Sequence, residues 1–277
     1  MRIDFPAHYT LADKLGWLAL RAFGVAMLVF LLLPILVIVP LSFSASSFLA
    51  YPMPGWSLQW YENLFTSAEW ARAAKNSFIV APAATVIATV LGTLTAVGLA
   101  RVQFPGKGLL MSVLIAPMVV PIVVVGVATY LFFARIGLSD SYTGLILVHA
   151  ALGAPFVVTT VLATLQGFNH NLVRASLACG ASPLTTFFRV TLPVIAPGVI
   201  SGALFAFATS FDEVVVTLFL AGPSQVTLPR QMFSGIREQI NPTITAAATV
   251  LILLSTLLLV TVELLRRRSE RLRGIKG

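Results

Sequence analysis

Residues 22–43 read AFGVAMLVFLLLPILVIVPLSF and contain no Asp, Glu, Lys, Arg or His. The charge-free run extends to residue 55, whereas a helix that crosses a bilayer needs only about 20 consecutive apolar residues. Comparable runs, interrupted only by His149, cover residues 76–100, 108–134, 141–166 and 190–210. Only 10% of the 277 residues are charged, against about a quarter in a typical soluble domain. The chain is therefore predicted to be a polytopic membrane protein.

These runs predict an all-α fold of about six transmembrane helices in a single transmembrane domain, residues 1–277. The expected spans lie near residues 20–43, 77–100, 109–134, 143–166, 195–221 and 243–265. Prolines inside these spans predict kinks, at Pro34, Pro82, Pro117, Pro121, Pro155 and Pro197. Gly198 and Gly202 have the GxxxG spacing, which favours close helix packing, with hinges in a moving bundle as the alternative.

The distribution of Lys and Arg predicts the orientation of the chain, because cytoplasmic loops carry an excess of both. With the N-terminus inside, the cytoplasmic segments hold Arg2, Lys14, Arg21, Arg101, Lys107, Arg174, Arg189, Arg266, Arg267, Arg268, Arg271, Arg273 and Lys276, and the outer segments hold Arg72, Lys75, Arg135, Arg230 and Arg237. We therefore expect both termini in the cytoplasm. Outside, we expect a short separate helix at 67–74 and a polar loop at 223–242 that can meet an external partner.

The net charge of +8 allows two interpretations. One is a nucleic-acid binder. The other is anchoring at anionic lipid headgroups, and it is simpler here because the basic cluster at residues 266–276 directly follows an expected span. We therefore expect membrane lipid, and no nucleic acid, as a partner.

Motifs of catalytic chemistry are missing from the sequence. It has no GxxxxGK[ST] phosphate loop, no HExxH and no GxSxG. The histidines His8, His149 and His170 do not have the spacing of metal ligands. We expect no catalytic residue, no metal site and no ATP hydrolysis by this chain alone. His149 lies inside an expected span, where a hydrogen-bonded interhelical histidine is favoured over a residue of a transport pathway.

The segment 166–193 is the most informative loop. Residues 172–179 can form a short helix, which Gly180 can end in a left-handed cap. Nine residues separate Gly180 from Val190, and Leu192-Pro193 follow. This spacing resembles the EAA loop of permease subunits in bacterial ABC importers, with Arg174, Ala175 and Ser176 at the positions of Glu-Ala-Ala.

The resemblance implies the type I importer permease fold in a bacterial inner membrane, and a coupling helix that docks on an ATPase. Its coupling residues would be Arg174, Ala175, Ser176, Gly180, Leu192 and Pro193. Arg174 stands where the family has Glu, so any contact made by that Glu is absent or reversed here.

The stretch 206–216, with Gly222-Pro223, Thr227-Leu228-Pro229 and Asn241-Pro242 after it, is similar to the second permease subunit of spermidine/putrescine-type transporters. That resemblance places Ser210, Asp212 and Glu213 along the route of a cationic solute. Adjacent carboxylates inside a span are a functional-site hypothesis in their own right. On a continuous helix they would point about 100° apart, so one is expected to face the route and the other a helix interface. A structural pair satisfied by a sister permease is the alternative.

The family resemblance also implies the partners: a homologous second permease, two ATP-binding cassette subunits that bind ATP and Mg²⁺, and an external solute-binding protein. The chain itself would need no cofactor and would translocate a small solute, a polyamine first of all, by alternating access. Ile122 follows Pro121 where that group commonly has Asp, so another amine, an amino-acid derivative or an anion remains an alternative solute. A channel subunit would instead show flux without ATPase, and an intramembrane enzyme would require paired catalytic groups.

Overall fold

The computed structural model describes residues 10–238 and 241–272 of the chain. Arg2, His8, Arg273 and Lys276 lie outside the described residues. Contacts between residues divide the chain into two compact units. One comprises Met1–Thr66 with Gly235–Gly277, and the other comprises Ser67–Ser234. The units are described separately below, and the single transmembrane domain stays a prediction.

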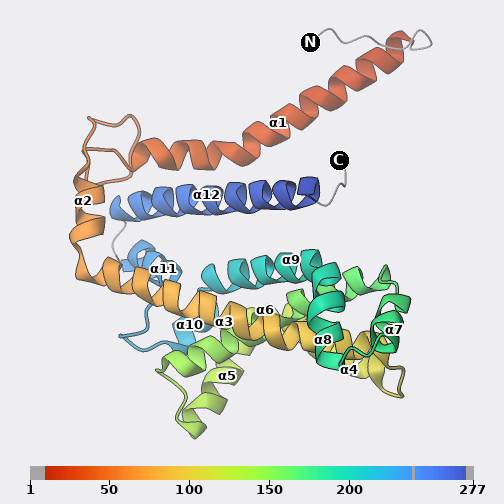
Figure 1. Cartoon of the computed structure of the whole chain (residues 1–277). Helices are drawn as coiled ribbons and strands as arrows, with labels where there is room; N and C mark the ends of the chain where they lie inside the picture. The colour runs from red at the N-terminus through yellow and green to blue at the C-terminus, as the bar shows by residue number, and fades with distance from the viewer. Residues whose placement is uncertain (1–9, 239–240, 273–277) are drawn as a thin grey trace. The chain divides into compact units, whose positions relative to one another are not determined.

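The described residues form helices joined by short loops (Figure 1). The first unit holds α1 (Leu11–Leu41), α2 (Gln59–Thr66) and α12 (Thr243–Leu272), and α11 (Leu228–Glu238) crosses the boundary. The second unit holds α3 (Ala68–Arg101), α4 (Lys107–Val119), α5 (Ile122–Ile136), α6 (Tyr142–Gln166), α7 (Asn171–Ala178), α8 (Pro183–Thr186), the π-helix η1 (Phe187–Thr191), α9 (Leu192–Phe211) and α10 (Val215–Leu220).

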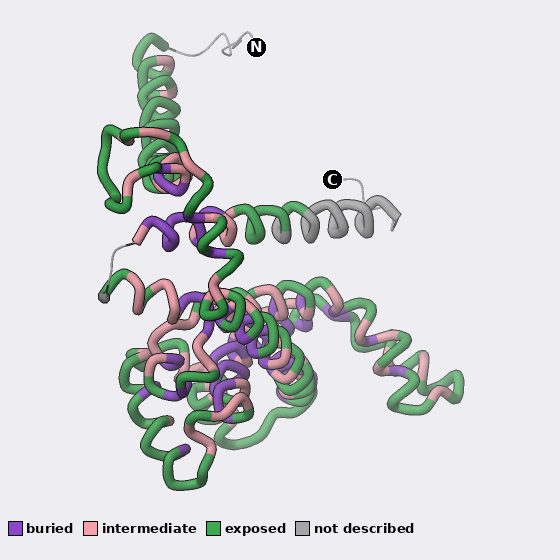
Figure 2. The backbone as a smooth tube through the Cα atoms, turned by 90° about the vertical axis from the view of Figure 1, so that its left-hand side faces the viewer, coloured by how far each residue is buried: buried purple, intermediate pink, exposed green. Residues whose placement is uncertain are grey.

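In the first unit, α1 is an apolar helix exposed along almost its whole length (Figure 2). It begins with a capping box in which Thr10 and Asp13 satisfy each other's backbone N–H groups. After α1 the chain turns back through a loop to α2. The indole N–H of Trp60, on α2, donates to the carbonyl of Ser44, in the loop, at 2.7 Å. Helix α12 contacts both α1 and α2. An exposed apolar surface of this kind suits contact with lipid.

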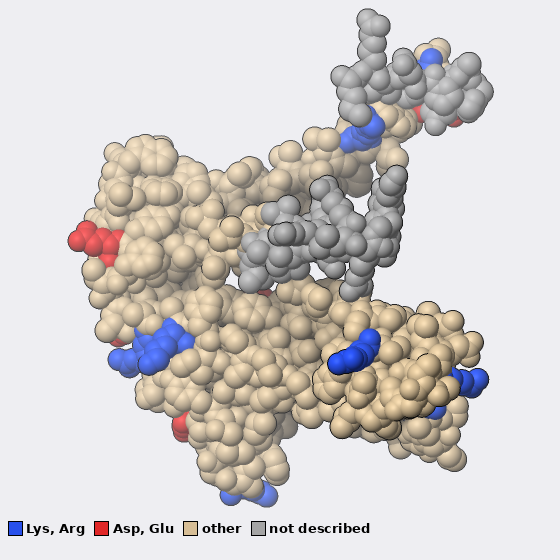
Figure 3. Space-filling model, in the orientation of Figure 1, with Lys and Arg blue, Asp and Glu red and all other residues tan. Residues whose placement is uncertain are grey.

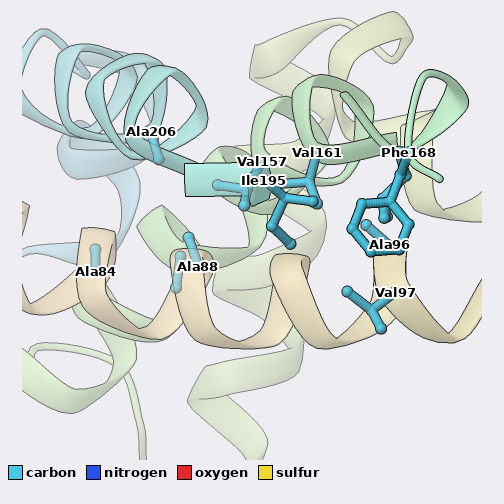
Figure 4. Close-up of a cluster of buried hydrophobic side chains, with 11 residues drawn as sticks. Ala84, Ala88, Ala96, Val97, Val157, Val161, Phe168, Ile195 and Ala206 are labelled. Carbon is cyan, nitrogen blue, oxygen red and sulfur yellow. The ribbon is translucent and has the colours of Figure 1, made fainter. Parts of the chain in front are cut away.

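The core of the second unit is built by α3, α6 and α9, which pack against one another. Figure 4 shows the side chains of this cluster, of which the labelled ones are small or β-branched except for one phenylalanine: Ala84, Ala88, Ala96, Val97, Val157, Val161, Phe168, Ile195 and Ala206. Glycines bring the backbones close together, because a Cβ on Gly202 would lie 2.5 Å from Thr160 Oγ1 and one on Gly198 would lie 2.1 Å from Thr164 Oγ1. This close approach supports the packing interpretation of the GxxxG pair.

Four described helical segments are long and apolar enough to cross a membrane. They are α1, α3, α6 and the continuous segment Pro183–Phe211, and the pair α4 and α5 makes five if it counts as one bent span. Within α12 the described apolar stretch is Thr243–Leu257, and the sequence continues it with Leu-Leu-Val-Thr-Val at residues 258–262. The expected count of six therefore stays a prediction, while the all-helical architecture agrees with the sequence.

The expected single span at 109–134 was wrong in form, because α4 and α5 meet at an angle of 104°. The break lies at Val120 and Pro121, and Val120 adopts an extended conformation with ψ 133°. Proline disfavours the helical conformation in the residue before it and has no N–H to donate, which explains the break. The separate helix expected at 67–74 was also wrong, since α3 runs without interruption from Ala68.

The expected span at 195–221 was wrong at both ends. Helical structure begins earlier, at Pro183, and α9 ends at Phe211. A separate short helix, α10, follows only at Val215. The chain therefore breaks at residues 212–214, where the sequence predicted a continuous helix.

Candidate coupling loop and solute pathway

Helix α7 ends in a Schellman motif. Gly180 has φ +84°, its N–H donates to the Leu177 carbonyl at 3.0 Å, and the N–H of Ala181 donates to the Ser176 carbonyl at 3.1 Å. These two bonds satisfy carbonyls that the helix end would otherwise leave unpaired. The predicted short helix with a left-handed glycine cap is confirmed.

One side of α7 is attached to the rest of the second unit. The Ser176 and Thr186 hydroxyl oxygens lie 3.0 Å apart, and Thr186 is buried. Val173 packs against the cluster formed by α3, α6 and α9. Arg174 and Ala175 are exposed, so the positions that correspond to Glu-Ala lie on the accessible surface of the unit. A partner can therefore contact Arg174 and Ala175 directly, while Ser176 fixes the helix.

The link from the loop to α9 contains a π-helical turn, in which the Leu192 N–H donates to the Phe187 carbonyl. Pro193 has no N–H and cannot donate to the Arg189 carbonyl four residues before it, so the α-helical ladder is interrupted there. Leu192 and Pro193 form the first turn of α9. The Leu-Pro pair thus lies in the segment that joins the α7–α8 region to a core helix.

Asp212 and Glu213 lie in the break between α9 and α10. Asp212 is the C-cap of α9, its N–H donates to the Ala208 carbonyl at 3.0 Å, and its side chain is exposed. Glu213 is half-buried, and its Oε1 accepts the Val216 N–H at 2.8 Å. The expectation that both lie within one continuous helix, on different faces of it, was therefore wrong, because α9 ends at Phe211 and α10 begins at Val215. Each carboxylate lies at a helix end instead. Asp212 ends α9, and Glu213 precedes α10, where its side chain accepts the Val216 N–H that the start of the helix would leave unpaired.

His149 joins the helices on the two sides of this break. Its Nδ1 lies 2.8 Å from Ser210 Oγ on α9, and its Nε2 lies 3.2 Å from Thr217 Oγ1 on α10. The imidazole is 1% exposed. The structure therefore favours the interpretation of His149 as a hydrogen-bonded interhelical histidine, and it brings Ser210 into the same cluster.

A second polar cluster holds the loop after α10. Asn76 Nδ2 donates to the carbonyls of Ser224 and Val226 at 2.9 and 2.7 Å, and the Tyr142 hydroxyl donates to Asn76 Oδ1 at 2.6 Å. The Arg230 guanidinium donates to the Ala221 carbonyl. Burial lowers the pKa of Arg230, and the nearby Asp140 opposes that shift.

The sequence analysis did not identify Asn76, Tyr142 and Arg230 as the residues that hold this loop. The available signal was a lone Asn at the start of an apolar run, since a buried amide requires hydrogen-bonding partners.

Charged side chains are sparse on the surface, as Figure 3 shows for one face of the described residues. Among the described residues no group of three or more His, Cys, Asp or Glu side chains is arranged to hold a metal ion. The candidate sites are the segments 171–193 and 210–217, which contain the site residues predicted from the sequence.

Residues 88–273 match the family model of the binding-protein-dependent transport system inner membrane component. The chain belongs to this family. Among its relatives are the spermidine/putrescine transport system permease protein PotC of Haemophilus influenzae and that of Escherichia coli K12. The first is 34% identical over 90% of this chain and 97% of the relative, and the second is 32% identical over 95% and 98%. The putrescine transport system permease protein PotI of Escherichia coli K12 is 34% identical over 80% of this chain and 82% of the relative.

Two solved structures show the same fold. A bacterial ABC transporter for import of the acidic polysaccharide alginate matches with a TM-score of 0.75, at 13% identity over 95% of this chain and 99% of that chain. The alginate transporter in complex with its pentasaccharide-bound periplasmic protein matches with a TM-score of 0.69, at 18% identity over 96% of each chain. This family member therefore has the fold of a type I ABC importer permease, and it is a non-catalytic, multi-pass membrane subunit of a transport system.

Proposed function

We propose that this permease subunit translocates a polyamine such as spermidine or putrescine into a bacterial cell by alternating access. The observation that carries the proposal is the match to permeases named for spermidine and putrescine transport over nearly the full length of both chains. The clustering of Ser210, Asp212 and Glu213 at a helix break adds support, because carboxylates in an apolar setting attract ammonium groups.

The proposed complex contains a homologous second permease, two ATP-binding cassette subunits and a periplasmic or extracellular solute-binding protein. ATP and Mg²⁺ bind to the cassette subunits, and this chain needs no cofactor of its own. The exposed side of α7, with Arg174 and Ala175, docks on a cassette subunit in the manner of a helix that binds in a groove. Ser176, Gly180, Leu192 and Pro193 transmit the movement to α9 through the loop and its π turn.

The proposed orientation has both termini in the cytoplasm, with α7 on the cytoplasmic face. The loop held by Asn76 and Tyr142 then lies on the outer face, where an external partner can reach it. The excess of Lys and Arg in the inner segments supports this orientation.

Uptake by proteoliposomes that contain the complete complex tests the function. Labelled putrescine and spermidine should enter only with ATP inside and the loaded binding protein outside. Asp212→Asn and Glu213→Gln should lower uptake while the yield of assembled complex stays near that of the parent. Parental uptake in both variants would show that the pathway assignment is wrong, and failure to assemble would show that the carboxylates are structural.

A second candidate function keeps the same machinery and changes the solute. Ile122 follows Pro121 at the start of α5, so this position carries no negative charge for a cationic solute. A thermal-shift screen of the cognate binding protein against amines, amino-acid derivatives and anions separates the two candidates. Flux of solute without nucleotide would point to a channel instead.

A further inference from the structure

One imidazole connects three helices around the break at residues 212–214. His149 lies on α6, Ser210 lies in the last turn of α9 and Thr217 lies in α10. All three side chains are buried, and the ring of His149 has a hydroxyl oxygen within hydrogen-bonding distance of each nitrogen. Nothing in the proposed function assigns a role to His149 or Thr217.

The directions of these hydrogen bonds follow from the number of protons available. Thr217 Oγ1 lies 3.1 Å from the main-chain carbonyl oxygen of Glu213, which can only accept. The single hydroxyl proton of Thr217 therefore goes to Glu213, and Thr217 accepts the N–H of His149 Nε2. The Nδ1 atom of the neutral ring then accepts, and the Ser210 hydroxyl donates to it.

Glu213 is consequently held at two points. Its carboxylate Oε1 accepts the Val216 N–H, and its main-chain carbonyl accepts the Thr217 hydroxyl. The first contact orients the side chain at the start of α10. The second connects the same residue, through Thr217 and His149, to α6. A shift of α6 relative to α9 and α10 would therefore change the position of Glu213.

We propose that His149 is a positioning residue for solute transfer, which joins α9 to α10 across the break and fixes Glu213 through Thr217. Both ring nitrogens are engaged and the ring is 1% exposed, so His149 does not contact the solute in this conformation. The inference rests on the proposed pathway role of Glu213. It adds the set of residues that holds this carboxylate in place.

The test compares variants of Thr217 with a matched threonine. Thr217→Val removes the hydroxyl with little change of shape, and Thr217→Ser keeps it. Thr85→Val is the control, because the Thr85 hydroxyl donates only within its own helix, to the Ala81 carbonyl at 2.7 Å. The measured quantity is putrescine taken up per ATP hydrolysed, in proteoliposomes with the complete complex and saturating loaded binding protein.

We expect Thr217→Val to lower this ratio at least about fivefold, because the variant loses both hydrogen bonds of the hydroxyl and one alone contributes about 1 kcal/mol. Thr217→Ser should restore most of the ratio, and Thr85→Val should leave it at the parental value. Because the hydroxyl acts through Glu213, the double variant Glu213→Gln with Thr217→Val should have a ratio no lower than that of Glu213→Gln alone.

Each failure has its own signature. A parental ratio in Thr217→Val beside a lowered ratio in Glu213→Gln overturns the role of His149 and leaves the pathway intact. A parental ratio in Glu213→Gln overturns the pathway role itself. If Thr217→Val yields no complex, His149→Gln, whose amide N–H can replace Nε2–H, should exceed His149→Leu in uptake per ATP. Equal ratios in these two variants overturn the inference.

Discussion

Replacing Gly180 with valine strains the turn between α7 and α8 without crowding it. Gly180 has φ +84°, and no heavy atom of the surrounding described residues lies within 4 Å of the place that a Cβ would occupy. Within this chain, the expected effect of Gly180→Val is therefore the strain that a positive φ imposes on the backbone. The two Schellman hydrogen bonds, to the Leu177 and Ser176 carbonyls, depend on that conformation.

The left-handed conformation costs an ordinary L-residue about 1–2 kcal/mol, and a β-branched residue at the upper end or beyond. A cost in that range depletes the native turn by about 5- to 30-fold. The variant should still assemble, because the contact of Ser176 with Thr186 and the packing of Val173 remain. Transport should uncouple from ATP hydrolysis, since the strained turn no longer joins the end of α7 to α8 in the native conformation. Gly180→Asn should be milder, because Asn tolerates positive φ better than other residues do.

The assay is putrescine uptake and ATPase rate in the same proteoliposomes, together with the yield of the complex. Gly137→Val is the matched control, because Gly137 has φ +71°, equally open surroundings among the described residues, and a position at the end of α5 far from the loop in sequence. It should remain coupled. Parental uptake per ATP in Gly180→Val, or equal uncoupling in Gly137→Val, would refute the assignment of this loop as the coupling element.

Two further predictions concern orientation and packing. The labelling test uses a Cys179→Ser background, because Cys179 is exposed. The variant Ser224→Cys should react with an impermeant thiol reagent added outside intact cells, and Ser269→Cys should not. Labelling of Ser269→Cys would contradict the proposed orientation. Gly202→Ala should lower stability by about 1–3 kcal/mol through overpacking, since its Cβ would lie 2.8 Å from the Val157 Cα. Gly98→Ala, in open surroundings on α3, should instead raise stability by about 0.5–1 kcal/mol. Thermal unfolding in detergent checks both, and equal shifts would contradict the packing argument.

Local features of the chain could be predicted well from the sequence. Apolar runs locate α1, α3 and α6 because insertion into a membrane depends on the composition of about 20 consecutive residues. Helix α7 and its cap could be predicted because the helix ends at a residue with positive φ, a conformation that glycine at position 180 adopts without strain. The close approach of α6 and α9 also follows from small residues such as Gly202, although the partner Thr160 could not be named.

Features that depend on distant parts of the chain could not be predicted. The loop after α10 is held by Asn76, about 150 residues earlier in the chain, and no local pattern indicates that pairing. The bend before α5 has a local cause in Pro121, but proline also occurs inside α3 and α6 without ending them. Whether a proline kinks or breaks a helix depends on which neighbours satisfy the freed carbonyls.

The break at residues 212–214 shows why the fold and the proposed pathway cannot be separated. A continuous helix through Asp212 and Glu213 would hold two charged groups in an apolar span, at a cost of at least about 2.5 kcal/mol each on insertion scales. Ending α9 at Phe211 instead creates a free N–H at the start of α10, which the Glu213 carboxylate accepts. Beside the break, His149 lies within hydrogen-bonding distance of Ser210 and Thr217, and the Thr217 hydroxyl donates to the Glu213 carbonyl. On the proposed pathway, the exposed side chain of Asp212 is open to a cationic solute or a sister permease, and the half-buried carboxylate of Glu213 faces that pathway in the position that Val216 and Thr217 hold.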